Sequence, residues 1–309
     1  MKILITGGFG YLGAKLSKLL IDEGYEIRIF GHSIPKNFQK NNDYEIILGD
    51  ILDKKKINDA CKGIDYILHL AGLDQQTCKN NPKLALLVNG TGTKSVLEAA
   101  QKEHVKKFIY MSTSQVYGKL KGRVTEATKP VPINDYGKTK LKGEHYCKQF
   151  NNGMKCIVMR LSNAYGAPLT DSGMNLVVND FCRQSVKKQK IILKTEGKQK
   201  RDFIAITDVC RAINILLRSE SKDLKEKIFN AGGDNTISIY ELAKLVAQTY
   251  LEVCGKEVKI EFDKKLVDTP VTDFVYDISR IRRLGFEPKA KIKEGIKAIF
   301  KTFKNQNAK

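Results

Sequence analysis

A cluster of four glycines close to the start of the chain limits the fold more than any other feature. The cluster follows an apolar run of strand type, Lys2–Thr6, and precedes a helical pattern of leucines. Its members are Gly7, Gly8, Gly10 and Gly13, which satisfy both the GxGxxG and the TGxxGxxG spacing. Glycines at this spacing allow a tight turn and let the backbone approach a pyrophosphate, whose charge is favoured at a helix N-terminus. The turn therefore predicts a dinucleotide site. The other residues expected to line it are Phe9, Tyr11 and Leu12.

Short apolar runs recur after this turn and alternate with longer helix-compatible segments. They are Glu26–Phe30, Tyr44–Leu48, Tyr66–Leu70, Lys107–Met111 and Lys155–Arg160. Such alternation is typical of a doubly wound parallel sheet with helices on both faces. We therefore expect an α/β, Rossmann-type domain over residues 1–165. The alternation then becomes less regular, so residues 166–309 are expected to form mainly a smaller mixed α/β substrate-binding lobe, with segments near 202–230 completing the core.

The composition argues against several other classes of protein. The 309 residues are 42% hydrophobic and 28% charged, which is ordinary for a globular domain. No apolar run approaches the ~20 residues that span a bilayer, so we expect a cytoplasmic protein with no membrane partner. The seven cysteines are scattered, without CxxC pairs or histidines at ligand spacing. This pattern favours reduced structural thiols and no metal site.

The formal charge of +20 raises the alternative of a nucleic-acid partner, because clustered lysine and arginine neutralise phosphates. Here the 54 basic residues are dispersed along the chain, without long blocks of like charge or a basic stripe with interleaved aromatics. A solvated lysine-rich surface is the favoured interpretation, and no nucleic-acid partner is expected.

The end of the predicted second strand bears on the choice between NAD and NADP. An acidic residue there binds the ribose 2′-hydroxyl of NAD, but the sequence reads Phe30-Gly31-His32-Ser33. Without the acid, a 2′-phosphate meets no repulsion, and His32 and Ser33 offer donors to it. The residues alone leave both cofactors open.

Several ordered motifs make the chain resemble the extended short-chain dehydrogenase/reductases, in particular their sugar-nucleotide epimerase/dehydratase branch. In order they are TGGFGYLG, Gly49-Asp50-Ile51, His69-Leu70-Ala71-Gly72, Asn89 with Gly92-Thr93, Ser112-Thr113 before Val116-Tyr117-Gly118, Tyr136-x-x-x-Lys140, Arg160 to Gly166, Arg201-Asp202-Phe203 and Asn230-Ala231-Gly232. The resemblance covers nearly the whole chain. The set of motifs is similar to that of the UDP-hexose 4-epimerase type.

The resemblance implies a role for each matching position. Asp50 corresponds to an aspartate that contacts the adenine, and Tyr136 and Lys140 to the catalytic pair. The implied cofactor residues besides the glycine turn are His32, Ser33, Asp50, Ile51, Leu70, Ala71, Gly72, Asn89, Tyr136 and Lys140. The implied substrate residues are Gln75, Thr113, Ser114, Gln115, Asn163 and Arg201, the last two matching contacts to the nucleotide or diphosphate. The corresponding substrate is a nucleotide-diphosphate sugar.

Tyr136 and Lys140 are four residues apart on a predicted helix that starts near Asn134 or Asp135, so they share one face. A nearby ammonium and an oxidised nicotinamide both favour the phenolate, which makes Tyr136 a candidate general base. By the resemblance it takes the proton of a sugar hydroxyl, commonly at C4, while hydride leaves that carbon for the nicotinamide and Thr113 holds the oxygen. Arg201 is suited to a diphosphate, and its alternative is a surface salt bridge with Asp202.

One departure from the family pattern narrows the chemistry. Dehydratases of this branch typically carry Asp-Glu after the threonine, whereas this chain has Ser114 and Gln115. Neither residue exchanges protons near neutral pH, so 4,6-dehydration is disfavoured. Epimerisation at C4 with NAD is slightly favoured. The alternatives are an NADPH-dependent 4-keto-sugar reductase, a nucleotide-sugar 4-dehydrogenase and, less favoured, a non-catalytic dinucleotide-sensing or RNA-associated protein.

A homodimer is also expected from the resemblance, because enzymes of this type pair through two long helices that form a four-helix bundle. The corresponding segments are Leu84–Gln101 and Asp135–Phe150.

Overall fold

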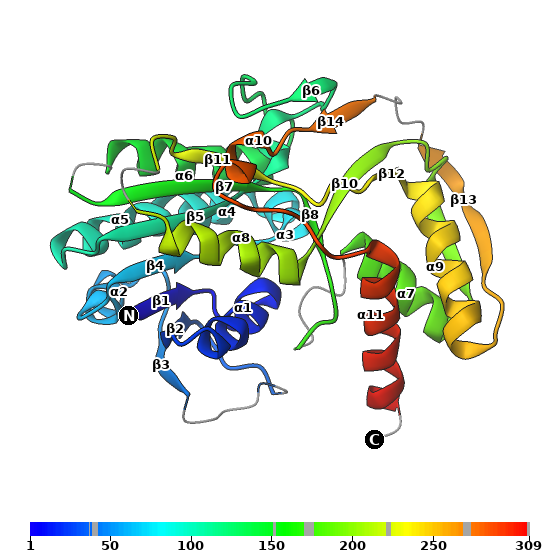
Figure 1. The fold of residues 1–309 in the computed structure, drawn as a ribbon, viewed down its shortest axis with the longest axis horizontal. Coiled ribbons are helices and arrows are strands. Elements are labelled where there is room, and N and C mark those ends of the chain that lie inside the picture. The colour runs from blue at the N-terminus through cyan, green and yellow to red at the C-terminus, as the bar shows by residue number, and fades with distance from the viewer. Residues whose placement is uncertain are drawn as a thin grey trace.

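The computed structural model describes residues 1–36, 38, 43–150, 153–169, 176–220, 224–267 and 273–307. A seven-stranded parallel sheet with the order β11-β7-β5-β4-β1-β2-β3 forms the centre of the larger body (Figure 1). Its strands are β1 (Lys2–Thr6), β2 (Glu26–Gly31), β3 (Tyr44–Leu48), β4 (Tyr66–His69), β5 (Lys107–Thr113), β7 (Lys155–Leu161) and β11 (Ile228–Ala231). The predicted Rossmann-type α/β fold is confirmed, and each predicted strand forms.

Helices cover both faces of this sheet because successive side chains of a strand point to opposite sides. On β1, Ile3 and Ile5 belong to one core cluster and Leu4 to the other. The first cluster includes residues of α1 and α8, which lie side by side, and the second includes residues of α2, α5 and α6. The bounds are α1 (Tyr11–Asp22), α8 (Ile206–Arg218), α2 (Lys54–Cys61), α5 (Thr93–Lys102) and α6 (Asp135–Gln149).

The long helical pattern after residue 82 is less regular than one continuous α-helix. It consists of α4 (Pro82–Ala85), a π-helical stretch η1 (Leu86–Gly92) and then α5. The glycines inside it differ: a Cβ on Gly92 would lie 2.9 Å from Cγ2 of Ile51, whereas one on Gly90 would meet only ordinary contacts. Gly92 therefore allows the loop after β3 to pack against this segment.

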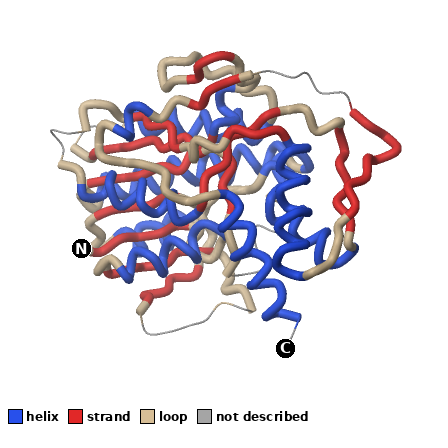
Figure 2. Tube along the Cα trace, turned by 45° about the vertical axis from the view of Figure 1, so that its right-hand side comes forward, coloured by secondary structure: helices blue, strands red, loops and turns tan. Residues whose placement is uncertain are grey.

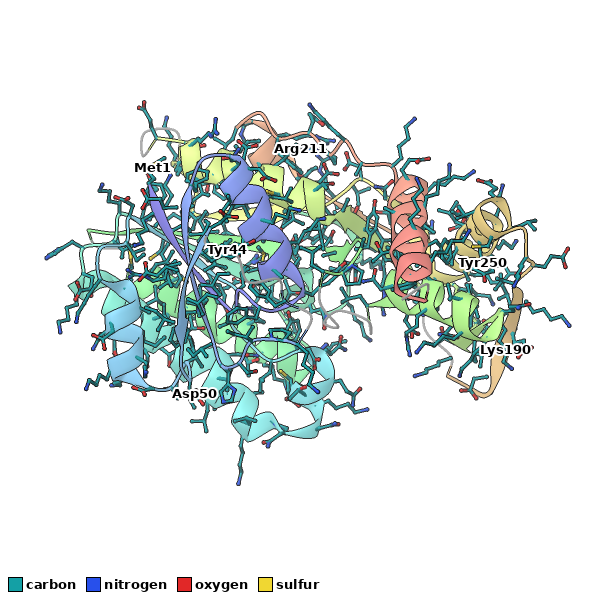
Figure 3. The ribbon with its side chains drawn as sticks, turned by 90° about the horizontal axis from the view of Figure 1, so that it is seen from below. Met1, Tyr44, Asp50, Lys190, Arg211 and Tyr250 are labelled. Carbon is teal, nitrogen blue, oxygen red and sulfur yellow. The ribbon has the colours of Figure 1, made fainter. Side chains whose placement is uncertain are left out.

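The smaller lobe lies beside the larger body (Figure 2) and has its own apolar core. Its helices are α7 (Val177–Lys188), α9 (Ile239–Cys254) and α11 (Ile292–Asn307), which pack on one another. Its strands are β8 (Asn163–Tyr165), β9 (Lys190–Thr195), β10 (Lys200–Ala205), β12 (Thr236–Ser238) and β13 (Lys259–Val267). Figure 3 shows Lys190 and Tyr250 on this lobe, and Tyr44 and Asp50 on the larger body.

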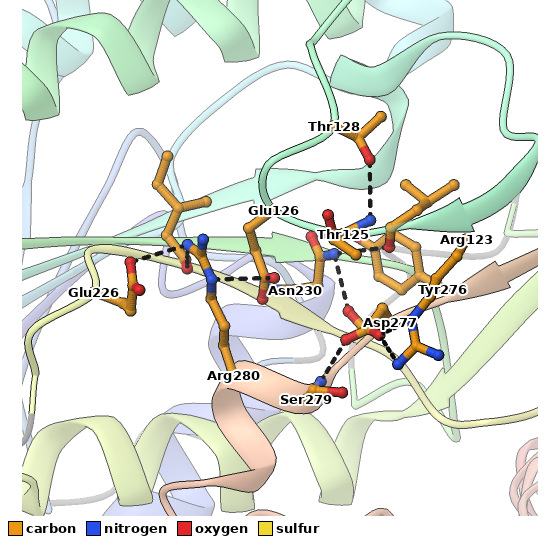
Figure 4. Close-up of polar contacts among 12 residues, drawn as sticks. Arg123, Thr125, Glu126, Thr128, Glu226, Asn230, Tyr276, Asp277, Ser279 and Arg280 are labelled. Atoms are coloured by element: carbon orange, nitrogen blue, oxygen red, sulfur yellow. Dashed lines mark hydrogen bonds and ion pairs between the residues drawn. The ribbon is translucent and has the colours of Figure 1, made fainter.

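The chain returns from the lobe to the larger body twice. β11 pairs with β7, and β14 (Phe274–Tyr276) pairs with β6 (Gly122–Val124). Polar contacts hold this return in place: the Asn230 amide donates to the Asp277 carbonyl at 3.0 Å, and its backbone N–H donates to Glu126 at 2.9 Å (Figure 4). Later segments thus contribute directly to the central sheet and its surroundings.

No helix in the described part of the chain is long and apolar enough to cross a membrane. All seven cysteines are free, and six of them are buried. Apart from Cys254, which is partly buried, the thiols are therefore packed inside the protein.

Candidate active site

The carboxyl ends of the parallel strands meet at one edge of the sheet, where ligands of doubly wound folds bind. The chain progresses from β1 through β2 to β3 on one side and continues with β4 on the other side of β1. The crevice between β1 and β4 is therefore the topological switch point. Most of the predicted site residues follow the ends of these strands, the glycine turn after β1 among them.

At Gly7 and Gly13, the turn has no room for a side chain. Gly7 has a φ of +70°, and a Cβ on it would lie 2.7 Å from the backbone nitrogen of Ala71. A Cβ on Gly13 would lie 2.3 Å from the carbonyl oxygen of Gly7. Gly10 is the N-cap of α1 and no side chain caps that helix end. The turn thus presents uncapped backbone N–H groups in a tight backbone cradle, which fits the pyrophosphate of a dinucleotide.

The side chains beside these glycines have other partners. Phe9 is buried and packs edge-on against Phe38, with ring centroids 5.0 Å apart. The Tyr11 hydroxyl donates to the carbonyl of Gly166 at 2.9 Å, and Leu12 packs against the first core cluster. Tyr11 therefore ties the start of α1 to the segment that leads into the smaller lobe.

The predicted adenosine end lies at the ends of β2 and β3. His32 and Ser33 are exposed directly after β2. Asp50 is also exposed, and its carboxylate accepts the backbone N–H of Leu52 at 2.9 Å, while Ile51 is buried against Gly92. An exposed carboxylate held by its own loop is available to a ligand on the surface of the crevice.

Hydrogen bonds hold the residues that follow β4 to β1 and to η1. The backbone N–H of Leu70 donates to the Thr6 carbonyl at 3.1 Å, and that of Ala71 to the Thr6 hydroxyl at 3.3 Å. Asn89 accepts the N–H of Leu73 at 2.7 Å. A Cβ on Gly72 would lie 2.9 Å from the Asn89 amide oxygen. Asn89 therefore holds the loop that follows β4 rather than standing free in the crevice.

Tyr136 and Lys140 lie on α6, which begins at Asp135 as the sequence predicts. Asn134 caps the helix by accepting the N–H of Gly137 at 2.8 Å. Lys140 is 5% exposed, and its Nζ lies 4.3 Å from the centroid of the Tyr110 ring. Thr113 ends β5, and its Oγ1 accepts the N–H of Gln115 at 3.3 Å. The three predicted catalytic residues thus come from α6 and from the end of the adjacent strand β5.

Burial sets the protonation of this pair in the protein alone. It raises the pKa of Tyr136 to about 12, an effect that Cys78 and Asp74 strengthen. Burial lowers the pKa of Lys140 to about 8. In the chain without a ligand, desolvation thus disfavours the charged form of both side chains.

The predicted substrate residues fall into two groups. Near the catalytic pair, the Gln115 amide donates to Gln75 at 3.1 Å and accepts from Asn134 at 2.8 Å. Ser114 is buried in the short helical turn η2 (Ser114–Tyr117) that also contains Gln115. The amides thus join α3 (Gln75–Asn80), η2 and the start of α6.

The second group lies on the strands of the smaller lobe. The Asn163 amide donates to the Asp202 carbonyl at 2.9 Å and so helps to join β8 to β10. The predicted alternative for Arg201, a salt bridge with Asp202, does not form. The Asp202 carboxylate instead accepts the N–H groups of Gly233 and Asn235. Among the described residues, the exposed Arg201 side chain has no hydrogen bond or ion pair to another residue.

Three residues near the site, Asn134, Glu144 and Arg160, were not among the predicted site residues. Asn134 would follow from its place as a helix N-cap, since asparagine is favoured there. Glu144 lies four residues after Lys140, and Arg160 stands inside the apolar run of β7. A carboxylate and a guanidinium at positions expected to be buried were the available signal for an ion pair.

The comparisons with known proteins agree with this geometry. The model of the NAD dependent epimerase/dehydratase family matches residues 3–232. A putative UDP-glucose 4-epimerase of Methanocaldococcus jannaschii is 30% identical over 99% of both chains. A dTDP-glucose 4,6-dehydratase of Streptomyces niveus is 25% identical over 100% of this chain and 94% of its own.

A solved structure gives the same result for the fold. The UDP-glucuronic acid 4-epimerase from Bacillus cereus, in complex with UDP-glucuronic acid and NAD, has a TM-score of 0.85 and 26% identity, with 99% of this chain and 100% of that chain covered. The prediction of an enzyme of the extended short-chain dehydrogenase/reductase type that uses NAD or NADP is confirmed. The chain belongs to the NAD dependent epimerase/dehydratase family.

Proposed function

We propose that the chain is a nucleotide-sugar 4-epimerase that acts through a 4-keto sugar intermediate. The observation that carries the proposal is the placement of Tyr136, Lys140 and Thr113 beside the sheet edge that holds the glycine cradle. Ser114 and Gln115 stand where dehydratases carry a carboxyl pair, which supports epimerisation over dehydration. The names of two relatives also support it, the putative UDP-glucose 4-epimerase of M. jannaschii and the UDP-glucuronic acid 4-epimerase of B. cereus.

In this mechanism Tyr136 takes the proton of the sugar C4 hydroxyl and returns it after the carbonyl has presented its other face. Thr113 donates a hydrogen bond to the C4 oxygen. Lys140 holds its ammonium on the same helical face as Tyr136 and favours the phenolate. A bound NAD supplies a hydride acceptor at C4, a hydride donor for the return step, and a positive ring that lowers the cost of the phenolate.

The proposed substrate is a nucleotide-diphosphate sugar. Several similar solved structures are complexes with UDP-sugars, among them the B. cereus epimerase. In this chain, the exposed Arg201 offers a guanidinium to a diphosphate, since it has no partner among the described residues, and Asn163 lies on the neighbouring strand. The amides of Gln75 and Gln115 lie near Tyr136 and face the sugar in this proposal.

Residues 1–165 form the cofactor domain in this proposal and residues 166–309 mainly the substrate lobe. The pairing of β11 with β7 supports the view that later segments complete the cofactor domain. The same proposal includes a homodimer through η1, α5 and α6. The exposed side chains of Leu84, Leu86 and Leu87 support such an interface.

The alternative function is that of an NADPH-dependent 4-keto-sugar reductase or a 4-dehydrogenase. It is favoured by one observation, the absence of an acid after β2, where His32 and Ser33 are exposed. An epimerase keeps its cofactor through each turnover, whereas a reductase exchanges it.

The purified protein should therefore be denatured and its released cofactor identified and counted by mass spectrometry. We expect near-stoichiometric NAD. The same preparation, without added cofactor, should convert UDP-glucose to UDP-galactose or the matching pair of a UDP-amino sugar or UDP-uronic acid. Bound NADP, or an empty protein that turns over only with added NADPH, would instead identify the reductase.

A further inference from the structure

A buried ion pair joins the helix of the Tyr/Lys pair, α6, to strand β7. Glu144 of α6 and Arg160 of β7 are 5% and 3% exposed. Arg160 Nε lies 3.0 Å from Glu144 Oε1, and its Nη2 lies 2.6 Å from Oε2, so the contact is bidentate. Burying two charges costs free energy that a good geometry only offsets, and hydrophobic replacements are often as stable. Such a pair is therefore a candidate for a role other than stability.

Glu144 has a second partner, which belongs to the catalytic strand. The Ser112 hydroxyl donates to Glu144 Oε1 at 2.5 Å, and Ser112 directly precedes Thr113. Glu144 also lies one helical turn beyond Lys140 and two beyond Tyr136, so all three share one side of α6. One carboxylate thus connects the helix that carries the Tyr/Lys pair to the strand that carries the threonine.

Arg160 extends the connection to the returning segments. Its guanidinium lies over the Tyr117 ring, with Cζ 4.7 Å from the centroid. The Tyr117 hydroxyl donates to the Asn230 amide oxygen at 2.6 Å, and the Tyr276 hydroxyl donates to the Arg160 carbonyl at 2.9 Å. Arg160 therefore has contacts with Tyr117 and Tyr276 as well as with Glu144. These contacts hold the guanidinium in place, and the guanidinium in turn fixes the Glu144 carboxylate.

We propose that Glu144 is a positioning residue for the reaction, which aligns Thr113 through Ser112 and supplies the negative charge that keeps the Lys140 ammonium charged. The proposal rests on the function proposed above. It assigns Glu144 no contact with substrate or cofactor.

The surroundings of Lys140 support the electrostatic part. Burial lowers the pKa of Lys140 to about 8, and Cys147, Glu144 and Cys78 act in the opposite direction. Tyr110 of β5 lies under the ammonium, Tyr136 shares its helix, and His69 of β4 is close enough for Lys140 to lower the pKa of the imidazole. Burial raises the pKa of both Cys147 and Cys78, so these thiols are neutral at physiological pH. Among the three groups that raise the pKa of Lys140, Glu144 is therefore the carboxyl group.

The experiment compares Glu144→Gln, the double variant Glu144→Gln/Arg160→Met and the control Glu126→Gln. The double variant removes both charges and so avoids an unpaired buried guanidinium. Glu126 is a matched control because it is also a buried carboxylate paired with an arginine, Arg280 at 3.4 Å, but it lies outside α6. The readouts are the pH dependence of kcat and the titration of Lys140, followed by NMR with lysine labelled at Cε and assigned with Lys140→Arg.

We expect the alkaline limb of the kcat profile and the titration midpoint of Lys140 to move down by about one pH unit in Glu144→Gln, and by less in the double variant, which also loses the positive charge of Arg160. The rate at pH 9 then falls about tenfold, with KM little changed. Glu126→Gln should match the wild type in both readouts. The proposal is overturned if neither Glu144 variant, when folded, shifts the midpoint of Lys140, because Glu144 would then be only structural. Absence of epimerase activity in the wild type would contradict the proposed function, while the Lys140 titration would still test Glu144.

Discussion

Gly7 and Ala71 lie in direct contact where the carboxyl ends of β1 and β4 meet. A Cβ on Gly7 would be 2.7 Å from the nitrogen and 2.8 Å from the Cα of Ala71. The positive φ of Gly7 is also one that side chains rarely adopt. Backbone atoms therefore form the base of the crevice at the switch point. A bound dinucleotide would lie above these atoms.

Replacement of Gly13 by alanine should abolish cofactor binding. The new Cβ would lie 2.3 Å from the Gly7 carbonyl oxygen, so the turn must move away from the geometry that accepts a pyrophosphate. Retained NAD in the purified variant, counted by mass spectrometry, is the measurement. Gly90→Ala is the control, because its Cβ meets nothing closer than 3.4 Å. It should keep its cofactor and unfold at the same or a slightly higher temperature, and a cofactor content equal in both variants would contradict the assignment of the cradle.

Replacement of Tyr136 by phenylalanine should lower kcat at least about a hundredfold, the low end of what a positioned acid/base group contributes. Folding and cofactor content should not change, because the ring remains in place. Tyr146→Phe, on the same helix, is the matched control and should retain wild-type turnover. Wild-type kcat in Tyr136→Phe would rule out this residue as the general base.

Replacement of Arg201 by glutamine should raise KM for the nucleotide sugar about tenfold or more, the range expected for a charge-assisted hydrogen bond to phosphate. The value of kcat should change little, since the contact lies away from the reacting carbon. Lys200→Gln is the control, because that exposed neighbour pairs with Asp273 at 2.7 Å. Steady-state kinetics separates the two constants, and an equal rise in KM for both variants would show a general charge effect instead.

The free energy of unfolding should decrease as the pH is lowered below about 6.5, because of His69. The buried imidazole binds Thr6 Oγ1 through Nδ1 at 2.6 Å and Thr93 Oγ1 through Nε2 at 2.9 Å, and burial lowers its pKa to about 3. The unfolded chain therefore binds a proton that the folded chain rejects, and the folded state loses about 2 kcal/mol between pH 7 and pH 5. Urea unfolding of the wild type and His69→Asn at both pH values measures the difference. The variant should lack this part of the pH dependence, and equal slopes would contradict the assignment.

A glutamate in place of Leu87 should convert the proposed dimer to a monomer. Leu87 is 47% exposed and lies in η1, which packs on α6. An ionised carboxylate at the centre of an apolar interface has no partner there. Val275 is 59% exposed on β14, far from these helices in sequence, so Val275→Glu is the control and should leave the mass unchanged. Light scattering after size-exclusion chromatography reports both masses, and a monomeric wild type would refute the dimer.

Local patterns were sufficient to predict six strands of the central sheet, all except β11. Each of the six reads as an apolar run bounded by polar or turn residues, and the glycine spacing marks the first crossover. The predicted helix start near Asn134 or Asp135 likewise agrees with the start of α6 at Asp135. These features depend on neighbours within a few residues, which is the range over which a single sequence is informative.

Contacts between distant segments were beyond that range. The partner of Glu144 is 16 residues away on β7, and Asn89 binds the loop after β4, so neither contact follows from spacing. The π-helical stretch η1 also has no local signal, because it differs from an α-helix by the register of its backbone bonds. The lack of an ion pair between Arg201 and Asp202 also depends on distant segments, because the Asp202 carboxylate accepts the N–H groups of Gly233 and Asn235 instead.

The pairing of β11 with β7 has a consequence for biosynthesis. A chain leaves the ribosome with its N-terminus first, yet β7 keeps an open edge until residues 228–231 have been made. The first core cluster also includes Ile281 and Phe286, which are translated after β11. An open strand edge is a site of aggregation. Until β11 has been made, the nascent chain therefore exposes this edge of β7 to pairing with other chains.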